Sequence, residues 1–240
     1  MDARNETAYP EHTFREILRS RIESGAYPLG MTIPGETELA ETYSVTSHQV
    51  QSAVHALVRE GLLRQVPGKG LFVCSPKMKR NLDELQGFTQ TMLEKHVTPS
   101  FRIMARQLQK AGLKHSLTFG IHPEDDIYYI KRLCYADREP VSLEEIFIPK
   151  YVVPKLDGID LTVFSIYEIY GMYGIQEERA VQTLDIVHLE QNDIRILGME
   201  PGEPVMMFQC TTYDVQNRAI EFNRNFVRGD KCDFSVHFNR

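Results

Sequence analysis

The sequence predicts an α+β protein built from two domains. The chain has 240 residues, and common domains have about 100 to 150. Apolar residues recur at helical spacing early in the chain, whereas most of the remainder is typical of strands separated by turns. We therefore expect a small helical domain over residues 1–75, a linker over 76–81, and a larger domain with a mostly antiparallel sheet over 82–240.

The composition is that of a globular protein. Hydrophobic residues make up 42% of the chain and charged residues 25%, which excludes a disordered chain. No stretch approaches the roughly 20 apolar residues of a membrane span, and the four cysteines include no C-x-x-C pair. We expect a soluble, cytoplasmic protein with reduced cysteines and no membrane contact. The net charge of -6 argues mildly against nucleic-acid binding, so that function can be inferred only from sequence pattern.

Three helices are predicted before residue 61. The first follows Pro10 and ends before Gly25, and the second begins after Gly35 and ends near Tyr43. The third begins at Thr46 and carries a stripe of valine and leucine at helical spacing. A simple helical bundle would also explain these three segments.

The third helix has the clearest start. Thr46 and Gln49 have the spacing of a capping box, and Val45 and Val50 occupy the positions of a hydrophobic staple. Because only a short turn separates the second helix from the third, the two predict a helix-turn-helix.

The segment after the third helix predicts a hairpin. Two short apolar segments, residues 61–66 and 71–73, flank a turn at 67–70 that has Lys69 at its tip. A dinucleotide-binding loop is excluded, because the third glycine of that motif is missing and a strand follows the turn. The hairpin argues against a simple bundle and predicts a wing beside the helix-turn-helix.

The second domain is predicted to mix helices and strands. Its predicted helices cover residues 82–95, 165–170 and 192–197, and its predicted strands cover 100–108, 128–135, 141–148, 204–213 and 219–227.

Four segments of the first domain carry a resemblance to a known family. They are PGETELA at 34–40, SVTS at 44–47, EGLL at 60–63 and GKGLFV at 68–73. In order and spacing they resemble landmarks of the GntR family of bacterial regulators, in its HutC subfamily. The resemblance implies a winged helix-turn-helix, and hence a transcription regulator, acting as a repressor, that binds a near-palindromic double-stranded DNA operator as a homodimer.

The predicted DNA-reading surface departs from this family. Arginine usually stands at the places of Thr37, Ser47 and Gln51, and arginine both reads guanine and clamps phosphates. We therefore expect an atypical operator and weaker non-specific binding; the alternative is a regulator homologue with weakened or lost DNA binding that acts as a small-molecule-binding module. The candidate DNA-contacting residues are Tyr9, Arg15, Thr37, Thr46, Ser47, His48, Gln49, Gln51, Arg64, Lys69 and Gly70.

The second domain carries a matching resemblance. Residues 132–144, 165–168, 198–202 and 220–231 resemble landmarks of the effector-binding (UTRA) domain of HutC-type regulators, whose fold is similar to chorismate lyase. The resemblance implies a pocket for a small effector such as a sugar, a sugar phosphate or an amino-acid-like metabolite. Its candidate residues are Thr89, Arg132, Glu144, Ser165, Tyr167 and Glu221.

The chemistry of these residues is mixed. Arg132, Thr89 and Ser165 suit an anionic group, whereas Glu144 and Glu221 suit hydroxyls or an amine. Each also has a structural alternative: the arginine in an ion pair, the glutamates at solvated strand positions and the serine as a helix cap.

Two further departures bear on the expected ligand. The family's sensors of phosphorylated sugars tend to have a second arginine where this chain has Cys134, and a tyrosine is replaced by Val227. A doubly charged phosphate is therefore less expected than a monoanion or a lightly charged sugar or amino acid.

A lyase-like enzyme is the remaining alternative, because fold does not determine function. The sequence contains neither H-E-x-x-H nor G-x-S-x-G, and its histidines form no catalytic or metal-ligand constellation. We expect no enzymatic activity, no metal and no cofactor.

Overall fold

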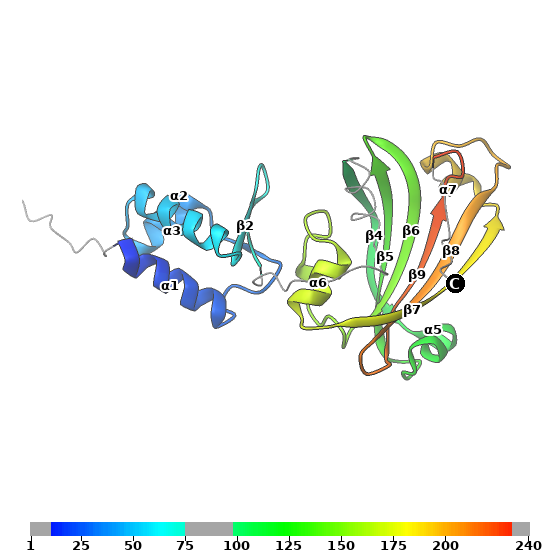
Figure 1. Cartoon of the computed structure of the whole chain (residues 1–240), viewed down its shortest axis with the longest axis horizontal. Coiled ribbons are helices and arrows are strands. Elements are labelled where there is room, and N and C mark those ends of the chain that lie inside the picture. The colour runs from blue at the N-terminus through cyan, green and yellow to red at the C-terminus, as the bar shows by residue number, and fades with distance from the viewer. Residues whose placement is uncertain (1–10, 75–97, 232–240) are drawn as a thin grey trace, which may run out of the picture. The chain divides into compact units, whose positions relative to one another are not determined.

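The computed structural model describes residues 11–74 and 98–231 (Figure 1). The chain divides into two compact units: residues 1–80 with 158–164 form the first, and residues 81–157 with 165–240 form the second. Tyr9, Thr89, the predicted linker at 76–81 and the predicted helix at 82–95 lie outside the described residues.

The first unit contains the three predicted helices and a small sheet (Figure 1). Its elements are α1 (Glu11–Glu23), β1 (Thr32–Ile33), α2 (Glu36–Tyr43), α3 (Ser47–Arg59), β2 (Leu63–Val66) and β3 (Gly70–Val73). The strands are antiparallel in the order β1-β3-β2, so the predicted wing hairpin is confirmed. The sequence did not predict β1, because two residues are too few to show an alternating pattern.

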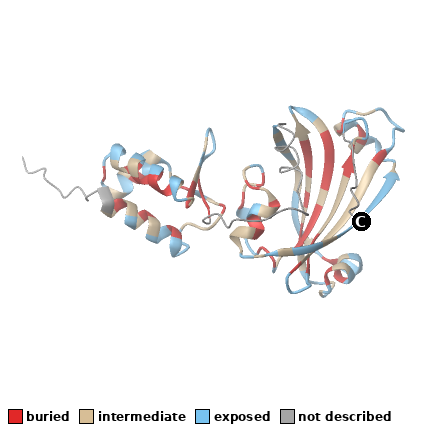
Figure 2. Ribbon diagram, in the orientation of Figure 1, coloured by how far each residue is buried: buried red, intermediate tan, exposed pale blue. Residues whose placement is uncertain are grey.

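The core of the first unit is formed by side chains from the three helices and from the wing strands. Phe14 and Leu18 of α1, Leu39 of α2 and Leu57 of α3 are fully buried and belong to one cluster (Figure 2). Val73 of β3 is buried in the same cluster. Burying such side chains stabilises the unit by roughly 1.5 to 3 kcal/mol each.

The second unit is built on an antiparallel sheet (Figure 1). Its strands have the order β4-β5-β6-β9-β8-β7. They are β4 (Pro99–Lys110), β5 (Asp126–Ala136), β6 (Glu139–Pro149), β7 (Glu177–Val187), β8 (Val205–Asp214) and β9 (Ala219–Val227). The helices are α5 (Gly112–Phe119), α6 (Ile166–Met172) and α7 (Gln191–Ile196), and a 3-10 turn covers Leu156–Gly158.

Two elements of this unit were not predicted. The strand β7 forms an edge of the described sheet, and its residues are exposed or half-buried on both faces, so they lack the alternation of a half-buried strand. The helix α5 exposes Leu113 and Leu117 and therefore shows no single apolar face.

Helices cover the two faces of this sheet differently. Leu133 and Leu143 pack against Ile194 of α7, and Phe119 of α5 packs against Phe147 on the same face. Figure 1 shows α5 and α7 toward opposite ends of the sheet. The other face carries the candidate ligand-binding residues.

Strand register places these candidates side by side. Arg132 on β5 lies opposite Glu144 on β6, which lies opposite Asn225 on β9. Directly opposed residues point to the same face of an antiparallel sheet, and so do residues two apart on one strand. Cys134 therefore shares the face of Arg132, and Glu221 shares the face of Asn225.

Candidate DNA-binding surface and ligand site

The predicted capping box begins the candidate recognition helix α3. The hydroxyl of Thr46 accepts a hydrogen bond from the backbone N–H of Gln49 at 3.3 Å. The backbone N–H of Thr46 donates in return to the side-chain oxygen of Gln49 at 2.9 Å. Both side chains therefore hold the helix terminus, which restricts their use in reading bases.

A second glutamine on α3 is held by the neighbouring helix. The side-chain amide of Gln51 donates to the carboxylate of Glu36 on α2 at 3.2 Å. Ser47 and His48, on the first turn of α3, and Thr37 on α2 are exposed. The exposed candidate surface thus carries short polar side chains next to a carboxylate.

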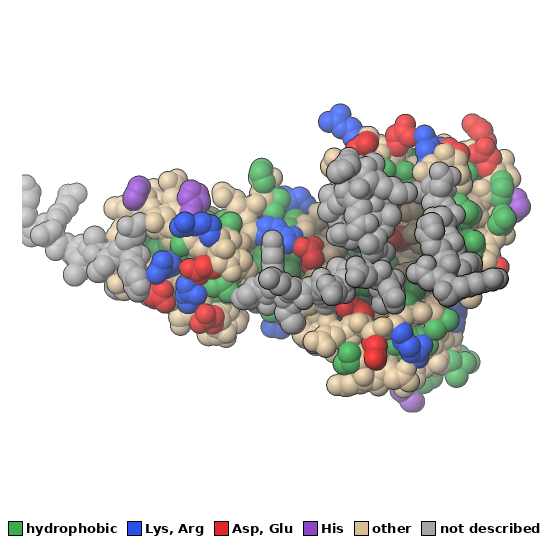
Figure 3. All heavy atoms as spheres, viewed as in Figure 1, with side chains coloured by type: hydrophobic (Ala, Val, Ile, Leu, Met, Phe, Trp, Pro, Cys, Tyr) green, Lys and Arg blue, Asp and Glu red, His purple; other side chains and the backbone are tan. Residues whose placement is uncertain are grey.

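The other candidate DNA contacts lie on the wing and on α1. Lys69 and Gly70 are exposed at the tip of the β2–β3 hairpin, and the Lys69 ammonium pairs with Asp160 at 3.0 Å inside the same unit. Arg64 on β2 is half-buried, and Arg15 on α1 pairs with an adjacent glutamate. On the face shown in Figure 3, acidic and basic side chains are mixed over this unit.

An ion pair lies at the centre of the candidate ligand site. Arg132 is 6% exposed and Glu144 is 7% exposed. The Nε of Arg132 donates to Glu144, and the guanidinium carbon lies 4.5 Å from the centre of the Phe101 ring. Burial lowers the pKa of Arg132, but the Glu144 carboxylate outweighs it, so the pKa is raised and the guanidinium stays charged.

A second buried carboxyl lies on the same face. Glu221 is 2% exposed, and it accepts hydrogen bonds from the hydroxyl of Tyr170 and the amide of Asn223, both at 2.8 Å. Burial raises the pKa of Glu221 above its ordinary value, although the two hydrogen bonds oppose this shift. The helix α6, which carries Tyr170, therefore contacts this face of the sheet.

Several polar atoms beside these carboxyls have unused hydrogen-bonding capacity. Nη1 of Arg132 and Oδ1 of Asn225 are buried and have no hydrogen-bond partner among the described residues. The hydroxyl of Ser142 is also buried, and among the described residues its one hydrogen-bond partner is the weakly bonding thiol of Cys134. Buried polar groups are normally paired, so such a cluster indicates a place for a ligand or for water.

The two candidates on α6 have different positions. Ser165 caps the helix: its hydroxyl accepts from the backbone N–H of Glu168 at 3.1 Å, and its own N–H donates to that side chain at 2.9 Å. Tyr167 is half-buried and packs against Tyr170. Its pKa is raised, mainly by burial and to a smaller extent by the nearby carboxyl of Glu221. Tyr167 therefore lies near the buried carboxyl of Glu221, whereas the side chain of Ser165 caps the N-terminus of α6.

Sequence reasoning missed four side chains of this site. They are Ser142, Tyr170, Asn223 and Asn225. The two asparagines follow Glu221 at intervals of two, so strand alternation was a signal that could have found them. Nothing in the sequence pairs Tyr170 with a strand residue distant in the chain.

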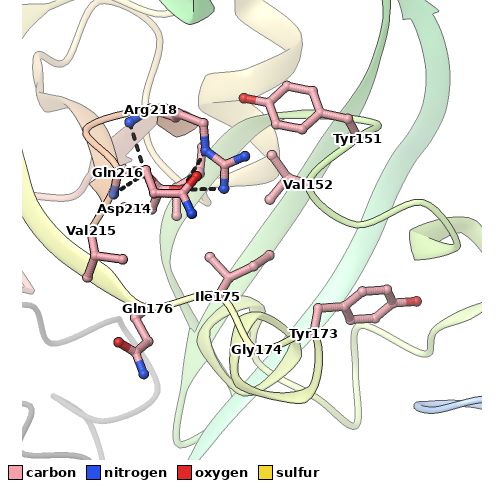
Figure 4. A pocket seen from close by; sticks show the side chains of 11 residues that line it. Tyr151, Val152, Tyr173, Gly174, Ile175, Gln176, Asp214, Val215, Gln216 and Arg218 are labelled. Atoms are coloured by element: carbon pink, nitrogen blue, oxygen red, sulfur yellow. Dashed lines mark hydrogen bonds and ion pairs between the residues drawn. The ribbon is translucent and has the colours of Figure 1, made fainter.

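A separate cavity lies at another part of the second unit (Figure 4). It has a volume of about 260 Å³ and is lined in part by Tyr151, Tyr173, Asp214 and Arg218. Asp214 and Arg218 form an ion pair at 2.6 Å. None of the predicted effector residues lines this cavity.

The described residues show neither a metal-binding cluster nor a membrane-spanning helix. Residues 11–74 and 98–231 contain no group of three histidine, cysteine or acidic side chains that could hold a metal ion. In the same described ranges, no helix is both long and apolar enough to cross a membrane.

The helix α3 follows a short turn, presents one exposed polar face and packs beside a wing hairpin, and these features define the class: a winged helix-turn-helix protein. Residues 12–73 match the model of the bacterial regulatory proteins of the gntR family, and residues 94–233 match the UTRA domain. The chain belongs to the GntR family of bacterial regulators and has the HutC arrangement, in which a UTRA domain follows the winged helix.

Individual relatives agree with this assignment. The transcriptional repressor NagR of Bacillus subtilis is 32% identical over 93% of this chain and 91% of its own length. A probable fructoselysine utilization operon transcriptional repressor of Shigella flexneri is 24% identical over 95% of this chain and 94% of its own. The crystal structure of PhnF from Mycobacterium smegmatis shares the fold, with a TM-score of 0.62 and 22% identity over 94% of this chain and 99% of its own. The protein is therefore a DNA-binding transcription regulator and not an enzyme, as the sequence predicted.

Proposed function

We propose that this protein is a cytoplasmic repressor whose operator binding is controlled by a small polyhydroxylated effector bound beside Arg132, Glu144 and Glu221. The observation that carries this proposal is the set of buried polar atoms on one face of the sheet, several of which have no partner among the described residues. The name of one relative, a probable repressor of a fructoselysine utilization operon, supports a sugar-like effector.

The proposed DNA contacts follow from exposure. Ser47 and His48 would contact phosphates and base edges from the first turn of α3, and the wing residues Lys69 and Gly70 would contact the backbone. Because the side-chain amide of Gln51 is hydrogen-bonded to Glu36, we expect α3 to make few strong contacts to bases. Because the first turn of α3 has no arginine, we also expect a modest affinity for random DNA.

The proposed mechanism is linkage between the two ligands. Two subunits pair and present two α3 helices to successive major grooves of a near-palindrome. The effector shifts the dimer between a DNA-compatible and an incompatible spacing, and a coupling of roughly 1 to 3 kcal/mol is typical.

The test combines operator selection with a site variant. Duplexes are selected on the full-length protein at low salt, and the dissociation constant of the selected operator is measured with and without effector candidates. We expect Arg132→Ala to bind the operator normally and to lose its response to the effector. If no sequence motif is selected, the proposal of a specific operator is contradicted. If the effector changes the operator affinity of Arg132→Ala as much as that of the wild type, Arg132 does not belong to the effector site.

A further inference from the structure

We propose that the effector carries no net negative charge: it is a polyhydroxylated molecule, neutral or bearing an amine, and it is not phosphorylated. This proposal rests on the proposed function, because it names the ligand class of the same site. Its basis is the balance of charges and of hydrogen-bond donors among the buried side chains.

The charge balance of the site disfavours an anion. Among the described residues, the buried side chains of this site that can carry a full charge near neutral pH are one guanidinium, on Arg132, and two carboxyls, on Glu144 and Glu221. The guanidinium already forms an ion pair with Glu144. A phosphate that took Arg132 would leave the Glu144 carboxylate buried without its partner, and breaking a buried pair in this way is strongly unfavourable.

Neighbouring positions that the structure describes add no buried positive charge. Cys134 shares the face of Arg132, and its thiol is neutral because burial raises its pKa well above the ordinary value. By register Arg106 also lies on this face, but it is exposed on the edge strand β4. Within residues 98–231, the buried part of the site therefore has one cation, which Glu144 neutralises.

The hydrogen-bonding groups favour a ligand rich in donors. Among the described residues, the carboxyl oxygens of Glu144 and Glu221 and the unpaired Oδ1 of Asn225 accept hydrogen bonds, Nη1 of Arg132 is an unpaired donor, and the hydroxyl of Ser142 can donate or accept. An ionised phosphate offers only acceptors. Hydroxyl groups donate and accept, and an ammonium donates three times, so a polyol or an amino polyol complements this set.

The experiment compares ligands that differ only in charge. Binding of glucose, glucosamine and glucose 6-phosphate, and of the matching galactose and mannose series, is measured by calorimetry and thermal shift on the full-length protein. We expect a neutral sugar or an amino sugar of one series to bind, and the phosphorylated sugar of the same series to bind with an affinity about a hundredfold lower.

Two variants test the physical cause. Glu144→Gln removes the charge that neutralises Arg132, and Cys134→Arg adds a second guanidinium to the same face. Each is expected to narrow or reverse the preference against the phosphorylated sugar. Should Cys134→Arg fail to fold, the nearly isosteric Glu144→Gln still decides. Gln107→Arg, at an exposed position of β4, controls for the change in net charge.

The outcomes separate this proposal from the one on which it rests. Tighter binding of a phosphorylated sugar to the wild type, lost in Arg132→Ala, would keep the effector site and overturn the charge assignment. A preference that neither Glu144→Gln nor Cys134→Arg changes would overturn the assignment as well. If no ligand binds, or if binding ignores Arg132→Ala, the effector site itself fails, and the proposed ligand class fails with it.

Discussion

The buried carboxyl of Glu221 links the stability of the second unit to pH. Its pKa in the folded protein lies above the ordinary value because of burial. A group with a raised folded-state pKa stabilises fully below its unfolded pKa, and this contribution is lost as pH rises through the folded-state value. We therefore expect the free energy of unfolding, measured by urea denaturation, to decrease as the pH rises from the unfolded-state pKa of Glu221 to its higher folded-state pKa.

The matched variants for this prediction differ in burial. Glu221→Gln has no proton to lose and should show a flatter dependence on pH. Glu178→Gln, at an exposed position of β7, should follow the wild type. Parallel curves for Glu221→Gln and the wild type would contradict the prediction.

The cap of α3 gives a second prediction for a single residue. Thr46→Ala removes the hydroxyl that accepts from Gln49, so the free energy of unfolding of the first unit should fall by about 1 kcal/mol. Thr46→Ser retains the hydroxyl and should lose much less. Chemical denaturation checks both variants, and equal losses would show that the hydroxyl is not the cause.

Residue pairs differ in how far the sequence could predict them. The Thr46–Gln49 pair is local, so its spacing was sufficient. Arg132 and Glu144 follow from the predicted hairpin, because the two strands flank one turn. The contact of Gln51 with Glu36 depends on how two helices pack, and no local pattern encodes that geometry.

Among the elements, α3 offers a gain-of-function prediction. Ser47→Arg places an arginine at an exposed position of the first turn, and we expect tighter DNA binding with a steeper salt dependence. One added phosphate contact increases the slope of log affinity against log salt by about 0.9. Fluorescence anisotropy with a fixed duplex at several salt concentrations measures this slope.

The control for this variant is again Gln107→Arg, which adds the same charge to an exposed strand position. A positive charge at a helix N-terminus costs a few tenths of a kcal/mol, so unfolding should be checked in parallel. An equal increase in slope for both variants would indicate a general charge effect and would remove α3 from the DNA interface.

The elements that the sequence predicted are those with a strong period or clear termini. The helices α1, α2 and α3 and the hairpins β2–β3, β5–β6 and β8–β9 belong to this group. The missed elements β1, α5 and β7 are short or exposed, so burial left no regular pattern in their residues.

At the scale of the whole molecule, the proposed linkage predicts a reciprocal effect. If saturating effector changes the operator dissociation constant by some factor, saturating operator must change the effector dissociation constant by the same factor. Typical couplings correspond to about 5- to 150-fold. Anisotropy and calorimetry on the full-length protein give the two factors, and unequal factors would show that a two-ligand scheme is incomplete.

The two capping boxes also constrain how this regulator can diverge over generations. Thr46 with Gln49 and Ser165 with Glu168 occupy the first turns of α3 and α6, the helices that carry the proposed contacts to DNA and effector. A substitution at these positions lowers helix stability before it can improve recognition. New operator or effector preferences are therefore expected to arise first at uncommitted neighbours such as Ser47 and His48, while the four capping positions change slowly.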